Sequence, residues 1–331
     1  MIAAWIASVM AGASRLLPEA EALTGDPSRG VAEHAIVRRM RLHDDQFDID
    51  DELVARLLAD QQPALADLPI SRVKSTGTVN ALFRIGDDQC ARLPLVERWV
   101  ESLRSELRWL PWLRERVTLQ IPEPIFEGEP TTWYPFPWAV FRWIDGAPYA
   151  DALVDDEREA ARTLAAFVLE LRASEISPDA PHGGRNPFRT LDVETREAIG
   201  ASSGVIDREA SMLAWERALR APVWDGRPTW IHADLLRPNL LVHGGRLTAV
   251  IDFGGAGIGD PATDVIAAWA VFGASGRAAY RASLDVDDGT WERARGVALH
   301  QAVLIIPYYA ETNPDFVALA KRTVEEILAD G

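Results

Sequence analysis

The hydrophobic pattern of this 331-residue chain changes character at residues 144–146, Ile-Asp-Gly. Before this point, short apolar runs alternate with turn residues, which predicts antiparallel strands with two helices among them. The strands are expected at 70–95 (three strands), 124–127 and 138–143. The helices are expected from an N-cap at Asp48 to about Pro63, and over 97–117 with Pro111 as a kink. The first part of the chain is therefore expected to be built around a sheet.

After residue 146 the apolar residues recur with helical spacing. Helices are predicted at 155–174, 205–220, 261–272, 289–306 and 315–329. Short strands are predicted at 229–232, 240–242 and 247–253, and a Pro- and Gly-rich loop at 175–190. The pattern predicts an α+β protein with a strand-rich lobe at 40–141 and a helix-rich lobe at 142–331.

Residues 1–39 mix Ala, Gly, Pro and Arg without clean periodicity. We interpret them as a poorly ordered N-terminal extension, with a docked helix as the alternative. No basic residue precedes their apolar part, and no later segment approaches the length of a membrane span. We therefore expect neither a signal peptide nor a membrane anchor.

The charge balance of the chain constrains its partners. The formal net charge is −16 and no Lys- or Arg-rich tract is present, so a surface for nucleic acid is not expected. An acidic protein attracts cationic small molecules instead. Cys90 is the single cysteine, which excludes an internal disulfide and fits a reducing cytoplasm. The oligomeric state stays open.

Polar residues interrupt the apolar stretch 229–252, TWIHADLLRPNLLVHGGRLTAVID. Asp234 and Asn239 fall in a loop, and Asp252 follows a predicted strand. Oxygen ligands of this kind suit Mg²⁺, which binds few protein groups and takes substrate phosphates as further ligands. The remaining one of the two Asp carboxylates is then free to accept a proton from a hydroxyl, which completes the set used for phosphoryl transfer in kinases. Each residue alone is more often a cap or a turn former.

The segments HADLLRPN (232–239) and IDFGGAGIGDPATD (251–264) resemble the aminoglycoside phosphotransferase family, relatives of the protein kinases. The resemblance runs from about Met40 to the C-terminus. It implies a bilobal protein-kinase-like fold, with an antiparallel-sheet N-lobe and a mainly helical C-lobe, and an enzyme that uses ATP or GTP. It further implies these roles: Asp234 as catalytic base, His232 as support of the catalytic loop, Asn239 and Asp252 as Mg²⁺ ligands, and Asp264 as a structural residue.

The first segment departs from the usual family pattern, HGDLHPGN. Ala233 replaces a Gly, Leu236 replaces a His, and Arg237-Pro238 replace a Pro-Gly pair. An Ala is tolerated unless the backbone requires positive φ, in which case the loop is strained. None of these changes removes the base or a metal ligand.

A Gly-containing turn between two predicted strands is the candidate phosphate-binding loop, although a hairpin turn needs no ligand. Its candidate residues are Ser75, Thr76, Gly77 and Asn80. Arg92 in the following strand and Glu106 in the next helix occupy the places of the kinase Lys and its partner. Arg is not equivalent to Lys, which leaves the choice between ATP and GTP open. Arg84 is the competing candidate for the phosphate role.

Phe141 and Trp143 fall at the predicted link between the lobes, where a kinase-like fold binds adenine through the backbone. For the acceptor, we expect groups from the helical lobe, namely the loop 175–190, Tyr308, Tyr309 and Glu311. The implied acceptor is a small molecule with a hydroxyl, such as a cationic aminoglycoside. A macrolide or a metabolite such as choline or homoserine would use the same catalytic parts.

Two functions of other classes remain as alternatives. The segment 257–262 satisfies G-x-G-x-x-A after a strand and before a helix, which is the fingerprint of a dinucleotide-dependent oxidoreductase. Against it, Asp260 brings negative charge to the place of the pyrophosphate, and no repeated βαβ pattern surrounds the match. The Arg at position 92 motivates the other alternative, a kinase-like protein that binds nucleotide without turnover.

Overall fold

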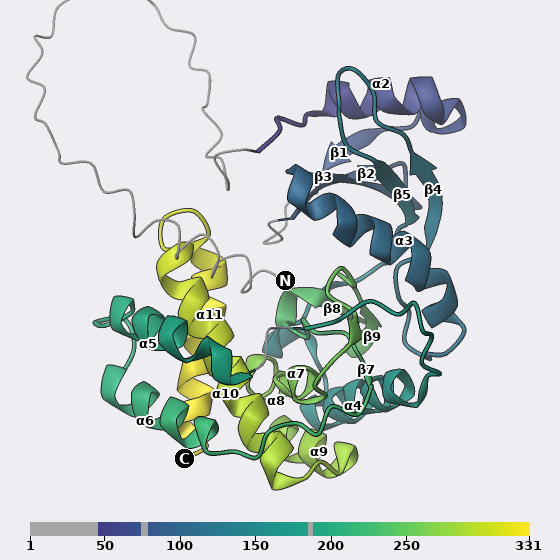
Figure 1. The fold of residues 1–331 in the computed structure, drawn as a ribbon. Coiled ribbons are helices and arrows are strands. Elements are labelled where there is room, and N and C mark those ends of the chain that lie inside the picture. Colours follow the sequence, from purple (N-terminus) through teal and green to yellow (C-terminus); the bar gives the residue numbers. More distant parts are fainter. Residues whose placement is uncertain (1–45, 74–78, 185–187) are drawn as a thin grey trace, which may run out of the picture.

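The computed structural model describes residues 46–73, 79–184 and 188–331 (Figure 1). The extension predicted at 1–39 lies outside the described residues. The same holds for the predicted phosphate-binding residues Ser75, Thr76 and Gly77.

A five-stranded antiparallel sheet forms the first lobe, with the strand order β1-β2-β3-β5-β4. The strands are β1 (Ile70–Arg72), β2 (Asn80–Ile85), β3 (Gln89–Pro94), β4 (Pro124–Gly128) and β5 (Trp138–Arg142). Alternate residues of β2 are buried, because one face of the sheet packs on the core and the other does not. All five predicted strands are confirmed.

Two α-helices accompany this sheet, α2 (Asp51–Gln61) and α3 (Val100–Arg114). The predicted N-cap of the first helix is wrong by two positions: Asp50 is the N-cap, and its side chain accepts the Leu53 N–H. Pro111 lies inside α3. Figure 1 shows α3 between the sheet and the second lobe, so a residue on this helix can contact both.

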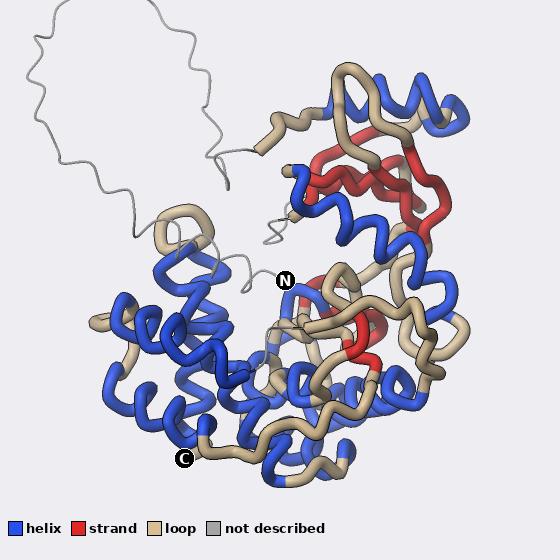
Figure 2. The backbone as a smooth tube through the Cα atoms, in the orientation of Figure 1, coloured by secondary structure: helices blue, strands red, loops and turns tan. Residues whose placement is uncertain are grey.

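The second lobe is mainly helical (Figure 2). Its α-helices are α4 (Glu157–Ala173), α5 (Asp192–Ala201), α6 (Arg208–Leu219), α7 (Ala262–Val265), α8 (Ala267–Ala270), α9 (Ala274–Leu284), α10 (Asp288–Tyr308) and α11 (Pro314–Ala329). The helix predicted at 261–272 is two short helices, and α5 and α9 were not predicted. Both unpredicted helices are poor in large apolar residues, since α5 reads DVETREAIGA and α9 reads ASGRAAYRASL.

Two small antiparallel sheets carry the segments that flank the polar residues of the second lobe. One contains β6 (Ala147–Pro148), β8 (Leu240–His243) and β9 (Arg246–Val250), and the other pairs β7 (Trp230–Ile231) with β10 (Gly257–Ile258). A tight turn joins β8 to β9, with Gly244 and Gly245 at φ of 55° and 76°, which Gly adopts readily.

This topology is the reason to reject a dinucleotide site. β10, which contains the first Gly of G-x-G-x-x-A, is a two-residue strand paired antiparallel with β7. Asp260 forms an ion pair with Arg293 at 2.9 Å and accepts the Ala262 N–H. A carboxylate therefore already occupies the place where a pyrophosphate would bind.

Two hydrophobic cores support the two lobes. One packs α2 against the sheet and includes Val54, Phe83, Leu93 and Trp138. The larger one joins the helices of the second lobe and includes residues of α3 and β5, such as Leu110 and Phe141. Within the described part of the chain, no helix is long and apolar enough to cross a membrane.

Candidate active site

The loop after β7 is clamped by a buried carboxylate. Asp264, in α7, accepts the backbone N–H of His232 at 2.9 Å and that of Ala233 at 2.8 Å. Burial raises the pKa of Asp264, and the neighbouring His232 and the two N–H donors oppose that shift. Ala233 has φ of 73°, the left-handed conformation in which Ala is strained by about 1–2 kcal/mol. The Gly-to-Ala departure therefore falls where a Gly is favoured, and Asp264 holds the strained turn in place.

The imidazole of His232 joins this loop to Ile251, the residue that follows β9. Its Nδ1 faces the Asp234 N–H at 3.2 Å, and its Nε2 lies 3.1 Å from the Ile251 carbonyl oxygen. This arrangement requires Nδ1 as acceptor and Nε2–H as donor. Burial lowers the pKa of His232, although Asp264 and Asp234 oppose the shift, and the ring packs edge-on against Phe253. His232 is thus placed to orient Asp234 rather than to exchange a proton.

The Asp234 carboxylate is held from two sides. Asn239 Nδ2 donates to its Oδ2 at 3.0 Å and to its backbone carbonyl at 2.9 Å. Gln301 Nε2, from the middle of α10, donates to Oδ1 at 2.8 Å. Gln301 was not identified as a site residue from the sequence, although a His-Gln pair inside the apolar run 297–306 indicates buried polar groups. With its amide nitrogen used inside the loop, Asn239 has its amide oxygen left for a cation.

Asp252 lies next to this pair. The Ile251 N–H donates to the Asn239 backbone carbonyl at 2.9 Å. Asp252 is the next residue in the chain, so this hydrogen bond holds it close to the loop. Its φ of 67° is left-handed. Burial raises the pKa of Asp252, Arg92 lowers it, and the Asp234 charge raises it further. A divalent cation between Asp252 and the Asn239 oxygen would offset this repulsion, and the donor set suits Mg²⁺.

Arg92 and Glu106 form a buried ion pair at 3.1 Å, as the sequence predicts. Burial raises the pKa of Glu106, and the Arg92 charge opposes that shift. The same carboxylate oxygen accepts the Phe253 N–H at 2.8 Å, which joins α3 to the turn after Asp252. Arg84, the competing candidate, instead bonds the Asp87 carbonyl and stacks on Trp143 at 4.5 Å. The structure therefore favours Arg92 for the phosphate role.

The predicted adenine region contains groups with different surroundings. Phe141 is buried, and the Arg92 guanidinium lies 5.0 Å from its ring centroid. The Trp143 backbone N–H donates to the Asp88 backbone carbonyl, and its indole N–H donates to the Asp145 carboxylate. Trp143 therefore has no donor left for a base. Asn80 opens β2, directly after the candidate phosphate-binding loop.

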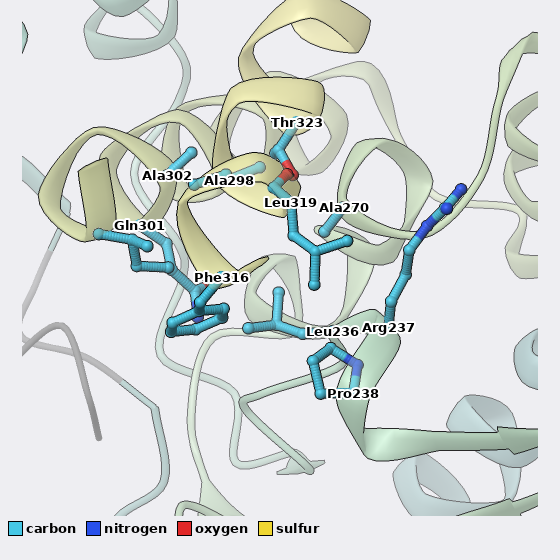
Figure 3. Close-up of a pocket in the computed structure, with 12 residues that line it drawn as sticks. Leu236, Arg237, Pro238, Ala270, Ala298, Gln301, Ala302, Phe316, Leu319 and Thr323 are labelled. Atoms are coloured by element: carbon cyan, nitrogen blue, oxygen red, sulfur yellow. The ribbon is translucent and has the colours of Figure 1, made fainter. Parts of the chain in front are cut away.

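Arg237, another departure from the family pattern, points from the loop into the second lobe. The Arg237 guanidinium donates to the Val271 carbonyl and forms an ion pair with Asp151 at 2.6 Å. In Figure 3 its side chain extends away from Gln301 and Phe316. Arg237 is only 6% exposed, so it anchors the loop to the lobe and does not reshape the mouth of the site.

The predicted acceptor groups do not share one environment. Tyr309 is buried, Tyr308 is half-buried and Glu311 is exposed. In the loop 175–190, the Gly183 N–H donates to the Ile258 carbonyl, so this part of the loop packs on β10. The Tyr308 and Tyr309 rings are in contact, with centroids 4.6 Å apart, but Tyr309 is buried, so of the three C-terminal candidates only Tyr308 and Glu311 are accessible to an acceptor.

Comparisons with known proteins agree with this geometry. The sequence pattern of the phosphotransferase enzyme family (APH) matches residues 72–297. The uncharacterized protein YcbJ of Bacillus subtilis (strain 168) is 25% identical over 196 residues, which are 53% of this chain and 60% of that protein. The chain thus matches less than two thirds of the length of this curated relative.

Solved structures share the fold. The GDP complex of aminoglycoside 2'-phosphotransferase-IIIa superimposes with a TM-score of 0.67 at 22% identity, covering 84% of this chain and 98% of that one. Macrolide 2'-phosphotransferase MphH from Brachybacterium faecium gives 0.53 at 18% identity, with coverages of 82% and 97%. The bilobal kinase-like α+β fold is confirmed, and the chain belongs to the phosphotransferase enzyme family.

Proposed function

We propose that this protein is a Mg²⁺-dependent kinase that transfers the γ-phosphate of ATP or GTP to a hydroxyl of a small molecule. One observation carries the proposal. Asn239 uses its amide nitrogen to fix Asp234, its backbone carbonyl accepts the N–H of Ile251, the residue before Asp252, and the Asp234 charge acts on the Asp252 carboxylate. A base and two metal ligands are thereby held in one loop and the adjoining turn.

In this mechanism Asp234 accepts the proton of the acceptor hydroxyl while the oxygen of that hydroxyl attacks the γ-phosphorus. The bond from the γ-phosphorus to the bridging oxygen breaks, and the nucleoside diphosphate leaves. Asn239 and Asp252 hold the metal, which when bound neutralises charge on the phosphate oxygens. Arg92 binds the nucleotide phosphates while Glu106 keeps its guanidinium in place.

For the acceptor, we propose a cationic antibiotic of the aminoglycoside type. The formal charge of −16 supports a cationic acceptor, and structurally similar proteins include a complex with GDP and kanamycin and one with gentamicin. A macrolide is the second candidate, since macrolide phosphotransferases share the fold. A hydroxyl metabolite of the choline or homoserine type is the third.

The nucleotide is ATP or GTP in this proposal, because similar structures contain GDP, ADP and ATP. Both nucleotides are abundant in the cytoplasm, where we place the protein; its single cysteine fits that compartment.

A direct assay tests the proposal. Purified protein is incubated with Mg-ATP or Mg-GTP and a panel of aminoglycosides, macrolides and amino alcohols, and products are examined by mass spectrometry. We expect one acceptor class to gain the mass of one HPO₃ group. Nucleotide binding without any transfer across the panel would favour the silent nucleotide-binding alternative.

A further inference from the structure

Gln301 is a buried polar residue of α10, a long helix of the second lobe. It is 2% exposed, and nearly all of α10 around it is buried. Other buried polar residues of this helix have structural partners: Arg293 pairs with Asp260, Arg295 with Asp330, and His300 with Thr195. Gln301 is different, because its partner is the candidate base Asp234, 67 positions away in sequence.

The two oxygens of Asp234 receive donors of different origin. Asn239, on Oδ2, belongs to the same loop as Asp234, and its amide oxygen is the atom proposed to bind the metal. Gln301, on Oδ1, belongs to a helix packed against α5, α6, α7 and α11. Two donors on opposite oxygens fix the rotation of a carboxylate about its Cβ–Cγ bond. Among the residues that the structure describes, Gln301 alone supplies this restraint from the packed helices of the lobe.

The amide oxygen of Gln301 indicates that packing alone does not explain why a Gln stands at this position. This atom, Oε1, is buried and accepts no hydrogen bond among the described residues. Burying a polar amide costs free energy that an apolar side chain of the same length does not cost, so an apolar residue would suit this core position better. Retaining Gln here makes physical sense if its N–H donor is needed.

A narrow pocket lies beside this amide (Figure 3). Its volume is about 20 Å³, and its walls are mainly apolar: Leu236, Pro238, Ala298, Ala302, Phe316 and Leu319. A space of this size can accommodate about one water molecule. It is too small for a sugar ring, so the pocket itself does not bind the body of an acceptor.

We propose that Gln301 is a positioning residue for phosphoryl transfer, which orients the Asp234 carboxylate toward the acceptor hydroxyl. This inference rests on the proposed function. Without the donor, the carboxylate rotates about its remaining contact with Asn239, and the acceptor proton is poorly aligned with it. Binding of the nucleotide should be unaffected, because within the described part of the chain the Gln301 amide hydrogen-bonds Asp234 and not Arg92, Glu106 or Asp252.

Two substitutions and a matched control test this role. Gln301→Met keeps the length of the side chain and removes the donor. Gln301→Glu keeps the shape but places a carboxylate against Asp234. Thr195→Val breaks a buried hydrogen bond to the adjacent residue, His300, on the same helix, without touching Asp234.

We expect kcat to fall by about 10–100-fold in Gln301→Met, a part of the 10²–10⁴-fold typical of a general base, and further in Gln301→Glu. The Kd for Mg-nucleotide should change less than about twofold, and kcat of Thr195→Val should stay within about twofold of wild type. The inference is overturned if kcat of Gln301→Met stays near wild type, or falls no further than that of Thr195→Val.

Crystal structures of wild type and Gln301→Met provide a readout that does not depend on transfer. We expect the Asp234 carboxylate to rotate away from its wild-type orientation in the variant. An unchanged, equally ordered carboxylate would overturn the inference. If the wild-type protein transfers phosphate to no acceptor, the proposed function fails, and the two structures alone decide whether Gln301 orients Asp234.

Discussion

Glu106 and Phe253 are joined by a hydrogen bond of 2.8 Å between the Phe253 N–H and the Glu106 Oε1, across 147 residues of chain. The same oxygen accepts the Arg92 guanidinium at 3.1 Å. Helix α3, strand β3 and the turn after Asp252 therefore meet at one atom. The nucleotide-phosphate and metal ends of the proposed site are coupled through it, since displacing Glu106 changes both.

Replacing Arg92 should damage both stability and nucleotide binding. In Arg92→Met the buried Glu106 carboxylate loses its counter-charge, which we expect to cost about 3–5 kcal/mol of unfolding free energy. Chemical denaturation measures this loss. The double variant Arg92→Met/Glu106→Leu should recover much of the stability, because no unpaired charge remains, but its Kd for Mg-nucleotide should stay at least about tenfold weaker.

Arg84→Met is the matched control for Arg92. Arg84 contacts the Asp87 carbonyl and the Trp143 ring, so this change should alter the Kd for nucleotide by less than about twofold. Calorimetric titration of both variants distinguishes the two arginines. If Arg84→Met weakened the Kd for nucleotide more than the Arg92 double variant does, the assignment of the phosphate role to Arg92 would be wrong.

Ala233→Gly should be nearly neutral for stability, within about 0.5 kcal/mol of wild type. It relieves about 1–2 kcal/mol of left-handed strain but loses a buried methyl group and gives the unfolded chain more freedom. Ala278→Gly, at an exposed position inside α9, is the control and should cost about 1 kcal/mol. Equal losses in urea denaturation of the two variants would show that Ala233 is not strained.

The N-cap of α10 should make stability depend on pH. The Thr290 hydroxyl and N–H hold the pKa of Asp287 below its ordinary value. Because the folded pKa is lower than the unfolded one, the stabilisation is present above about pH 4 and is lost as pH falls through the folded pKa. Asp287→Ala should therefore lower Tm at pH 7, equivalent to about 1 kcal/mol or less at this exposed position, and the difference should shrink below about pH 4.

Asp287→Asn is the control for this effect. Asn caps a helix about as well as Asp, so its Tm at pH 7 should lie close to wild type. A gap between wild type and Asp287→Ala that stayed constant down to about pH 2 would exclude the ionised carboxylate as the stabilising group.

Much of the architecture could be predicted from the sequence because its local signals agree with its tertiary structure. Short apolar runs separated by turn residues, such as the Gly-Gly pair after β8, identify strands directly, and the structure shows alternating burial in β2. The helix starts were less reliable. Asp48 and Asp50 are both acceptable caps, and only the bond to Leu53 decides between them.

The site was only partly predictable, for a similar reason. Asp234, Asn239 and Asp252 stand in a recognisable order, and the structure places them side by side. The apolar run around Gln301 signals a buried polar residue, but its contact with Asp234 depends on the packing of α10, which no local pattern records. The replacement of a family Gly by Ala233 raised the question of a positive φ, but the sequence could not answer it, because Ala rarely adopts that conformation and the Asp264 clamp lies about thirty residues further on.

The central claim is that Asp234 is the base of a phosphoryl transfer for which Asn239 and Asp252 hold the metal. The most direct test compares wild type with Asp234→Asn, measuring kcat/KM for the acceptor and, in parallel, the Kd for Mg-nucleotide. We predict a loss of kcat/KM of about 10²–10⁴-fold, with nucleotide affinity within about threefold of wild type. Transfer by Asp234→Asn at close to the wild-type rate would contradict the account.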